Sequence, residues 1–420
     1  MEERKRKVNI LMMVLAFMSF STGIWSNYRG LWLQTVGFNI TDISRIISVG
    51  LVCSAVISFV ISSFSTKIKV KNVITLAMIF RIIAMITLMF VREEYIIKTC
   101  MLLGIMCEYI FSISYYPLLS FIDKSDETYK RKNIVNYVAN DIAVIGCGLL
   151  IGFTLGKFVF DYETCLLLST ACSIAALIFL LLFKDEEVKK KKESITLVKS
   201  IKSIFKDKIN NIYLLDQLFV YISYGIVFDL MMIILTEYIG FEVSFSSVLI
   251  IACNFIGTVL AILFNKHGTK LSISISTVIK YGSRTLAYLI AFLMNNRLSF
   301  IIAIIVAYVS SRILDNKTSG VFIERVEKEY QFLFSNIRYF AVCVGEGIGA
   351  FLAGVLLGHS IKVLFLGAFI FTLLQTLVLI YLDKLKKDWF LLKNIVLLTR
   401  SCSGFGCTFT FILRIYGYIW

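Results

Sequence analysis

Three charged residues, Arg29, Glu108 and Asp229, lie inside long apolar stretches of this 420-residue chain. A charge surrounded by apolar sequence is costly to bury, so it usually contacts a ligand, carries a proton or forms an ion pair. We expect Arg29 to bind an anionic or hydrogen-bonding group of a solute. We expect Glu108 or Asp229 to bind a cation or to carry a coupling proton. A static ion pair between helices is the competing interpretation.

Polar side chains accompany these charges at helical spacing. Glu108, Ser112 and Tyr115 are spaced i, i+4, i+7, which places them on one face of a helix. The candidate set for substrate or ion binding also includes the two residues before Arg29 and one tyrosine of a later apolar stretch. Its members are Arg29, Glu108, Asp229, Asn27, Tyr28, Ser112, Tyr115 and Tyr308.

A second pattern pairs tyrosines with acids. Tyr137 and Asp141 are spaced i, i+4, and Tyr339 and Glu346 are spaced i, i+7, so each acid shares a helix face with a tyrosine. Two interpretations fit this pattern equally. The pairs could form a proton relay, or each tyrosine could cap a carboxylate that serves only packing.

The elements that hold these residues must be membrane helices. Hydrophobic residues make up 58% of the chain and charged residues only 17%, too few to cover a water-soluble surface of this size. The apolar stretches are long enough to cross the hydrocarbon core of a bilayer. The predicted spans are 8–33, 46–64, 72–91, 97–120, 134–155, 163–183, 211–236, 244–264, 271–293, 298–314, 336–357 and 361–382. The fold class is therefore an all-α integral membrane protein with about twelve helices.

The distribution of basic residues predicts the orientation. The net charge is +15, and the lysines and arginines concentrate in alternate loops. By the positive-inside rule these loops face the cytoplasm, which puts both termini on that side of the cytoplasmic membrane. The same clustering explains the charge without nucleic acid, because no basic face with interleaved aromatic residues is present.

The linker between the sixth and seventh spans, residues 184–210, begins with a run of charges and continues as an amphipathic pattern. Its apolar residues recur at steps of three and four, with lysines between them: Ile195, Val198, Ile201, Phe205 and Ile209. Such a helix could lie on an anionic leaflet or pack on the protein's own surface. Residues 385–420 form a tail that we expect to be interfacial or disordered.

The two halves of the chain, residues 1–183 and 211–384, repeat each other at an offset of about 200 residues. In the fifth and eleventh spans Tyr137 matches Tyr339, and the glycines that follow match too, as do the lysines of the loops after the second and eighth spans. Six spans, a linker and the same six spans is the layout of the major facilitator superfamily (MFS). The chain resembles this family over roughly residues 5–384, which implies two pseudo-symmetric six-helix bundles.

The loop signature of that family is only partly present. It requires an acid between glycine and basic residues, and this chain has Thr66 and Asn265 at the two acid positions. The residues that the resemblance assigns to cytoplasmic gate loops are Lys67, Lys71, Asn265, Lys266, Gly268, Lys270, Arg131 and Arg338.

The resemblance implies transport by alternating access around a cavity lined by spans 1, 4, 7 and 10. Arg29, Glu108 and Asp229 lie in three of these spans. Charges in the peripheral spans, among them Arg81 and Lys280, are expected to form structural pairs. We therefore predict a secondary transporter, coupled to protons or another ion, that acts as a monomer on a small organic solute. Efflux of an amphipathic compound and symport of a sugar or cation both remain open.

Other classes of protein fit less well. A non-transporting membrane sensor or assembly protein, and a flippase for lipid-like substrates, are the alternatives. The sequence contains no phosphate-binding loop, no nucleophile motif and only two histidines, so we expect no enzymatic activity, no cofactor and no metal site.

Overall fold

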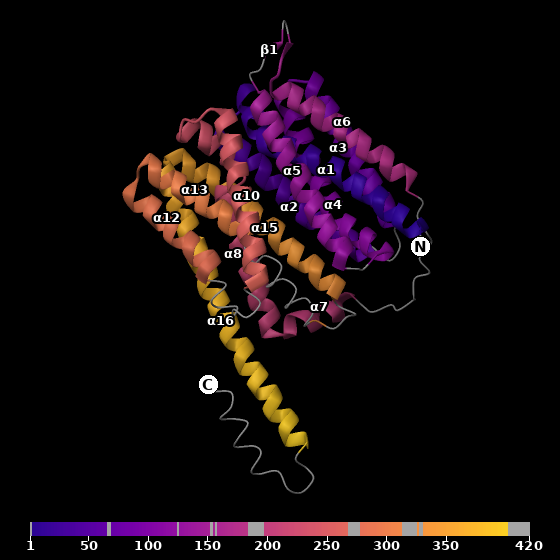
Figure 1. The fold of residues 1–420 in the computed structure, drawn as a ribbon, viewed down its shortest axis with the longest axis vertical. Coiled ribbons are helices and arrows are strands. Elements are labelled where there is room, and N and C mark those ends of the chain that lie inside the picture. The colour runs from indigo at the N-terminus through magenta and orange to yellow at the C-terminus, as the bar shows by residue number, and fades with distance from the viewer. Residues whose placement is uncertain are drawn as a thin grey trace.

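The computed structural model describes residues 2–64, 69–123, 126–151, 154–155, 158–183, 197–267, 278–312, 326 and 331–401, and these are almost entirely helical. The first half contains six long helices, and a short antiparallel hairpin joins the last two (Figure 1). They are α1 (Glu2–Thr35), α2 (Ile40–Phe64), α3 (Val70–Phe90), α4 (Glu94–Ile122), α5 (Asp126–Leu150), β1 (Thr154–Leu155), β2 (Phe158–Val159) and α6 (Tyr162–Leu182).

The second half repeats this pattern with more interruptions. Its seventh span consists of three helical pieces, and the described part of its ninth starts with a π-helix. The elements are α7 (Leu197–Lys206), α8 (Lys208–Val227), α9 (Met231–Ile233), η1 (Ile234–Tyr238), α10 (Val243–His267), η3 (Val278–Gly282), α12 (Ser283–Met294), α13 (Arg297–Arg312), α15 (Gln331–His359) and α16 (Ile361–Ser401).

Ten helices of the described residues are long and apolar enough to cross a membrane. The other two predicted spans, 271–293 and 298–314, correspond to η3 with α12 and to α13, which are shorter in the part of the chain described here. Large apolar side chains on the outer faces are more than half exposed, as at Leu76, Ile83, Leu181 and Leu286. Such a surface is stable against lipid rather than water. The prediction of a multi-pass membrane protein is confirmed.

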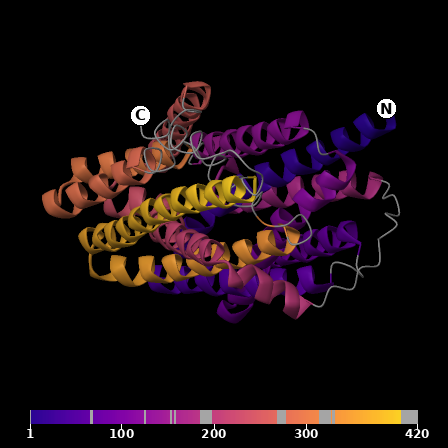
Figure 2. The ribbon, with the colours of Figure 1, turned by 90° about the horizontal axis from the view of Figure 1, so that it is seen from below.

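The helices form two bundles that lie side by side (Figures 1 and 2). In the first bundle α1 packs against α5 and α6, and α3 packs against α4 and α6. In the second, α8 packs against α15 and α16, and α12 against α13 and α16. The bundles meet where α2 packs on α15, α5 packs on α10 and α1 packs on α9.

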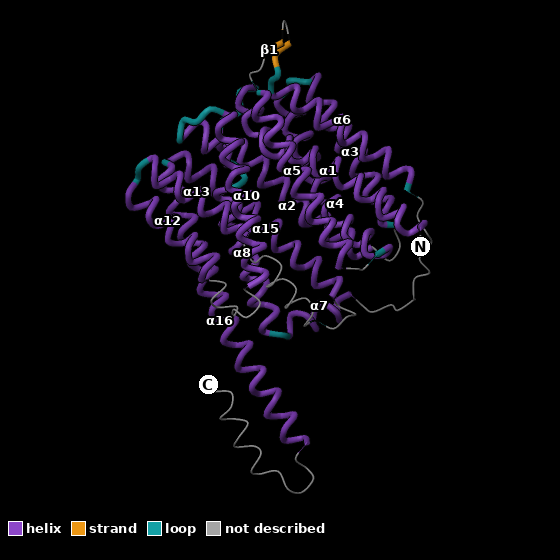
Figure 3. Tube along the Cα trace, in the orientation of Figure 1, coloured by secondary structure: helices purple, strands orange, loops and turns teal. Residues whose placement is uncertain are grey.

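The linker helix α7 packs against α8 and α15. Ile204 is buried and Ile201 lies against the same apolar core, whereas Phe205 is 46% exposed. The amphipathic pattern allowed two placements for this helix, on a leaflet or on the protein's own surface. The inner face of α7 packs on the protein's own surface. After its membrane span, α16 continues as a helix through Ser401 and projects beyond the bundles (Figure 3).

The two ends of the molecule are packed differently. We call the end that carries the β1–β2 hairpin the distal end, and the end that carries α7 and the first turns of α1 the terminal end (Figure 1). Towards the distal end one apolar core, the distal core, joins both bundles. It includes Trp32 and Ile43 of the first bundle and Met231, Ile250 and Ala353 of the second.

Towards the terminal end each bundle has a core of its own. The terminal N core includes Leu11, Met18, Leu118 and Leu180. The terminal C core includes Ile204, Tyr213, Phe334 and Leu382. Phe59 of α2 reaches from the first bundle to the terminal C core and stands edge-on to Phe340, with ring centroids 6.1 Å apart.

Candidate functional site

The seventh span is broken at Asp229. Helix α8 ends at Val227, residues 228–230 form a turn, and the chain continues through α9 into the π-helical η1. Irregular segments inside membrane helices are tolerated where they lie within the protein, and π-helical turns often occur at functional sites. The break therefore places the Asp229 carboxyl at an interruption of the helix near the contact between the bundles.

Glycine brings the helix of Asp229 against the helix of Glu346. A Cβ atom at Gly225 would lie 2.3 Å from the backbone oxygen of Glu346, which is too close for any other residue without a shift of backbone. Helices α8 and α15 consequently approach each other as closely as small-residue contacts allow. The carboxyl groups of Asp229 and Glu346 lie close enough to interact electrostatically.

A tyrosine from the other bundle reaches the same point. The Tyr109 hydroxyl of α4 lies close to the Glu346 carboxyl and to Asp229, and it interacts electrostatically with both. Tyr109 thus connects the first bundle to a pair of acids in the second. Two ionised carboxylates in contact repel each other, so the pair is most stable when it holds one proton.

Two arginines and a third acid complete the group, which we call the central cluster: Arg29, Arg81, Glu108, Asp229 and Glu346. Arg29 of α1 interacts electrostatically with both Asp229 and Glu346. Glu108 interacts with Arg81 of α3 and with Glu346. With two cations and three acids, the cluster is neutral when the acids share one proton.

Several polar atoms of the central cluster are buried and have no hydrogen-bond partner among the described residues. They are Arg29 Nε, Arg81 Nε, Arg81 Nη2 and Asp229 Oδ2. Arg29 is 6% exposed and Arg81 only 1%. Each such atom costs about 1–3 kcal/mol when it stays unsatisfied. The arrangement therefore favours a bound polar group that would pair with these atoms.

Other residues of the predicted binding set form contacts outside the central cluster. Asn27 donates to the Gly23 carbonyl one turn back, and Ser112 donates to the Glu108 carbonyl. The Tyr115 hydroxyl donates to the Leu11 carbonyl within the terminal N core. Tyr308 is buried in the second bundle, edge-on to Phe228 at 4.8 Å.

Tyr28 ties the bundles together at the distal core. Its hydroxyl donates to the Val144 carbonyl of α5 at 2.7 Å and lies 2.9 Å from Ser247 Oγ of α10. Gly148 makes room for this contact, because a Cβ atom there would lie 2.1 Å from Ser247 Oγ. Gly354 of α15 approaches α2 in the same way, since its Cβ would lie 1.8 Å from Ser44 Oγ.

The two tyrosine–acid pairs lie in different surroundings. Asp141 accepts a hydrogen bond of 3.2 Å from Asn254 of α10, which is another link between the bundles. Tyr137, one turn before Asp141, is 41% exposed. Glu346 belongs to the central cluster, and its matched tyrosine, Tyr339, is half-buried two turns away. The proton-relay interpretation stays a prediction.

Three of the predicted gate residues have described contacts at the terminal end. Arg131 donates to Asn9 of α1 at 2.9 Å, Arg338 donates to Gln217 of α8 at 2.9 Å, and Lys71 donates to the Phe183 carbonyl. Lys67, Gly268 and Lys270 lie outside the described residues. Asn265 and Lys266 belong to the backbone of α10, and their side chains are outside the description as well.

The described residues also show whether metal-ligating side chains come together. Within the described residues, no three side chains of histidine, cysteine, aspartate or glutamate are placed so that they could hold a metal ion.

The shape of the chain is similar to that of several solved transporters. A point mutant of the nucleoside transporter NupG superimposes with a TM-score of 0.71 at 14% identity over 89% of this chain and 99% of that one. A POT family transporter in complex with a thioalcohol-conjugated peptide gives 0.66 at 12% identity over 91% and 96%. No family model and no curated protein matches the sequence.

The chain has the fold of the major facilitator superfamily. The prediction of this fold is confirmed, with the number of spans approximate. In the MFS arrangement α1, α4, the broken span of α8–α9–η1, and α13 are spans 1, 4, 7 and 10. Arg29, Glu108 and Asp229 come from the first three of these and lie together in the central cluster.

Two members of the site were not predicted by the sequence analysis. Arg81 was expected to form a structural pair in a peripheral span, but it lies between α3 and α1, donates to Thr22 at 3.2 Å and interacts with Glu108. Tyr109 was not singled out at all. Tyr109 follows Glu108 directly in the sequence, which was the one available indication. Because a helix turns by 100° per residue, however, neighbouring residues point in different directions, and the position of Glu108 does not predict where Tyr109 points.

Proposed function

We propose that this protein is a secondary transporter that moves a small organic solute across the cytoplasmic membrane by alternating access. One observation carries the proposal. The central cluster buries four ionisable side chains from both bundles, beside the half-buried Asp229, and several polar atoms of the cluster have no partner among the described residues. In a membrane helix such groups are costly unless they pair with one another or contact a substrate or ion, and the unpaired atoms of this cluster favour the second.

The proposed solute has a hydrogen-bond-accepting or anionic group for Arg29 and a donor group for the acids. The transporters of similar shape support a solute of this size, since they are a nucleoside transporter and a peptide transporter. A complex of a POT family transporter with 5-aminolevulinic acid, which has an amine and a carboxylate, is similar as well.

Proton coupling would use the contact between Asp229 and Glu346. The pair belongs to the second bundle, whereas Tyr109 and Arg29, a hydroxyl donor and a cation that both stabilise an ionised carboxylate, belong to the first. A relative movement of the bundles changes the distances between these groups. The affinity of the acids for a proton then changes with the state of the carrier, which is the requirement for coupling.

The packing supports a state that is closed at the distal end. Both bundles share the distal core there, and Tyr28, Gly148 and Gly354 make close contacts between them. By the positive-inside rule the terminal end faces the cytoplasm. The proposed state is thus closed to the outside, with the path to the central cluster running from the cytoplasm between the separate terminal cores.

The test is flux into proteoliposomes that contain the full chain. Labelled uridine, dialanine and 5-aminolevulinic acid are offered with and without an inward pH gradient. We expect at least one to accumulate only with the gradient, and Glu346→Gln to abolish this dependence. Glu237→Gln, which removes an exposed acid of η1, is the matched control. Saturable binding of a solute without any flux would contradict transport, and gradient-driven flux unchanged in Glu346→Gln would contradict the coupling site.

A further inference from the structure

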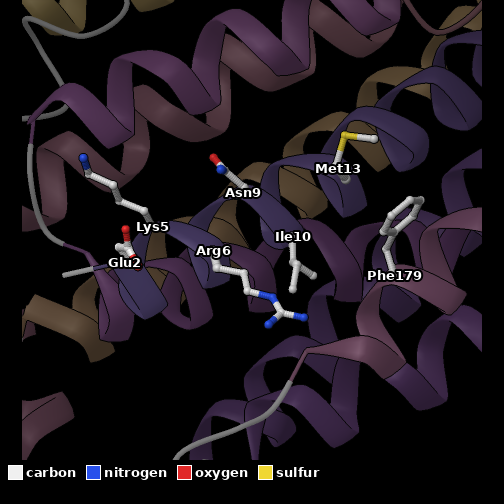
Figure 4. A pocket seen from close by; sticks show the side chains of 7 residues that line it. All are labelled: Glu2, Lys5, Arg6, Asn9, Ile10, Met13 and Phe179. Atoms are coloured by element: carbon white, nitrogen blue, oxygen red, sulfur yellow. The ribbon is translucent and has the colours of Figure 1, made fainter.

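A cavity of about 380 Å³ lies between α1 and α6 at the terminal end, apart from the central cluster. Its lining comes from the first three turns of α1 and from one aromatic residue of α6 (Figure 4). The residues are Glu2, Lys5, Arg6, Asn9, Ile10, Met13 and Phe179. None of them is part of the site proposed for transport.

The basic residues of this region differ in whether they have partners. Arg4 forms an ion pair of 2.6 Å with Asp123, and Lys7 forms one of 3.2 Å with Glu3. Lys5 and Arg6, which lie between them in the sequence, form no ion pair with any other residue that the structure describes. Both are exposed and both line the cavity. Among the described residues, two of the four basic side chains here have an ionic partner, and the other two line the cavity.

The wall of the cavity is mostly apolar, and Lys5 and Arg6 border it towards the start of α1. Met13 lies about 10 Å further along the helix axis than Arg6, because a helix rises 1.5 Å per residue. At that depth Ile10, Met13 and Phe179 form an apolar wall, and Phe179 is held in place by stacking on Phe17 with centroids 5.6 Å apart. Met13 is 44% exposed. The apolar wall therefore reaches the surface of the molecule.

We propose that this cavity binds an anionic phospholipid. The phosphate contacts Lys5 and Arg6 at the level of the headgroups, and an acyl chain lies along Ile10, Met13 and Phe179. A basic site at the end of a membrane helix with an apolar groove below it matches both parts of such a lipid. Glu2 lines the same cavity and opposes the phosphate, so it lowers the affinity that the two cations provide.

The experiment measures lipid binding by the purified full chain in a neutral detergent, using native mass spectrometry with phosphatidylglycerol and phosphatidylcholine. We expect phosphatidylglycerol to be retained preferentially. Each basic residue contributes a factor of about five near a membrane surface, so the Lys5→Gln, Arg6→Gln double variant should bind phosphatidylglycerol about 20-fold more weakly. Glu2→Gln should bind it several-fold more tightly. Met13→Glu should weaken both lipids, because it places a charge on the apolar wall.

The matched control is the Lys202→Gln, Lys206→Gln double variant, which removes two exposed charges of α7 at the same end. It should bind phosphatidylglycerol like the unaltered protein. Equal retention of the two lipids, or an equal loss in the two double variants, would overturn the proposal. Full competition by millimolar inorganic phosphate would also overturn it, because the ligand would then be the anion rather than the lipid. None of these outcomes depends on solute transport.

Discussion

The distal and terminal ends of this protein contain similar helices but differ in how the two bundles meet. At the distal end one core includes side chains of both bundles, and glycines let their helices approach closely. At the terminal end each bundle buries its apolar residues in a core of its own. Among the described residues, apolar packing therefore joins the bundles extensively at the distal end and at the terminal end mainly through Phe59.

The difference in packing between the two ends indicates where the bundles can move relative to each other. Separating the distal core would expose apolar side chains of both bundles, whereas each terminal core stays intact when the bundles rotate. The central cluster lies between the two ends and takes members from both bundles. A rocking motion that opens one end and closes the other would change the electrostatics of this cluster more than the interior of either bundle.

The largest effect on flux is expected from substitutions in the central cluster, because it lies between the two ends and takes residues from both bundles. In an Asp229→Asn, Glu346→Gln double variant the acids can no longer exchange a proton. Losing hydrogen bonds to charged groups costs about 1.5–3 kcal/mol each, so gradient-driven flux should fall about 100-fold or more, while exchange of solute without a gradient persists. Flux measured at a series of pH values should lose its pH dependence. A pH profile identical to that of the unaltered protein would remove these acids from the coupling mechanism.

The next effect concerns closure of the distal end. Gly148→Leu places a side chain where Ser247 now lies, and overpacking of this kind costs about 1–3 kcal/mol. We expect amide hydrogen exchange to increase in the distal halves of α5 and α10, and flux to fall about tenfold. The control is Gly146→Leu on the same helix, since no atom lies within 4 Å of a Cβ there. Equal effects of the two substitutions would argue against a specific contact between the bundles.

A smaller effect is expected from the polar contact beside it. Tyr28→Phe removes the hydroxyl that contacts Val144 and Ser247, which is worth about 0.5–1.5 kcal/mol for each hydrogen bond. The equilibrium should shift about fivefold towards distal opening, again seen as faster hydrogen exchange in α10. Tyr115→Phe, which loses a hydrogen bond inside the first bundle only, should lower stability without this shift.

The smallest effect is expected at the terminal end. Phe59→Ala removes the ring that stands edge-on to Phe340 across the bundles. An aromatic pair of this kind contributes about 0.5–1.5 kcal/mol, and flux should change by less than about threefold. A change as large as that of Gly148→Leu would mean that the terminal end is held as firmly as the distal one, and the comparison of the two ends would fail.

Much of the architecture could be predicted from the sequence. Long apolar stretches with few charges predict the membrane helices, and the repeat between the two halves predicts the two bundles. The three charges Arg29, Glu108 and Asp229 could be selected because a charge in an apolar stretch is conspicuous. That these three residues lie close together was predicted from the resemblance to a known family of transporters, not from any local sequence pattern.

Other features of the site could not be read from the sequence. The turn at residues 228–230 has neither proline nor glycine, and it depends on packing against neighbouring helices. The spacing grouped Glu346 with Tyr339 on one helix face, whereas the groups that interact with it in the structure include Asp229 and Tyr109, which are distant in the sequence. Such pairings depend on how each helix is rotated about its own axis. A helix that is apolar on all sides gives no sequence pattern that specifies this rotation.

The most direct test of the account measures two distances in one protein by electron paramagnetic resonance. Spin labels on a keto amino acid, which leaves the native cysteines untouched, replace Arg45 and Glu242 at the distal end, or Arg131 and Lys206 at the terminal end. In the unaltered background the account predicts a short, narrow distal distance. In Gly148→Leu the distal distance should lengthen while the terminal distance shortens. If both distances change in the same direction, or neither changes, the two bundles do not rock about the central cluster.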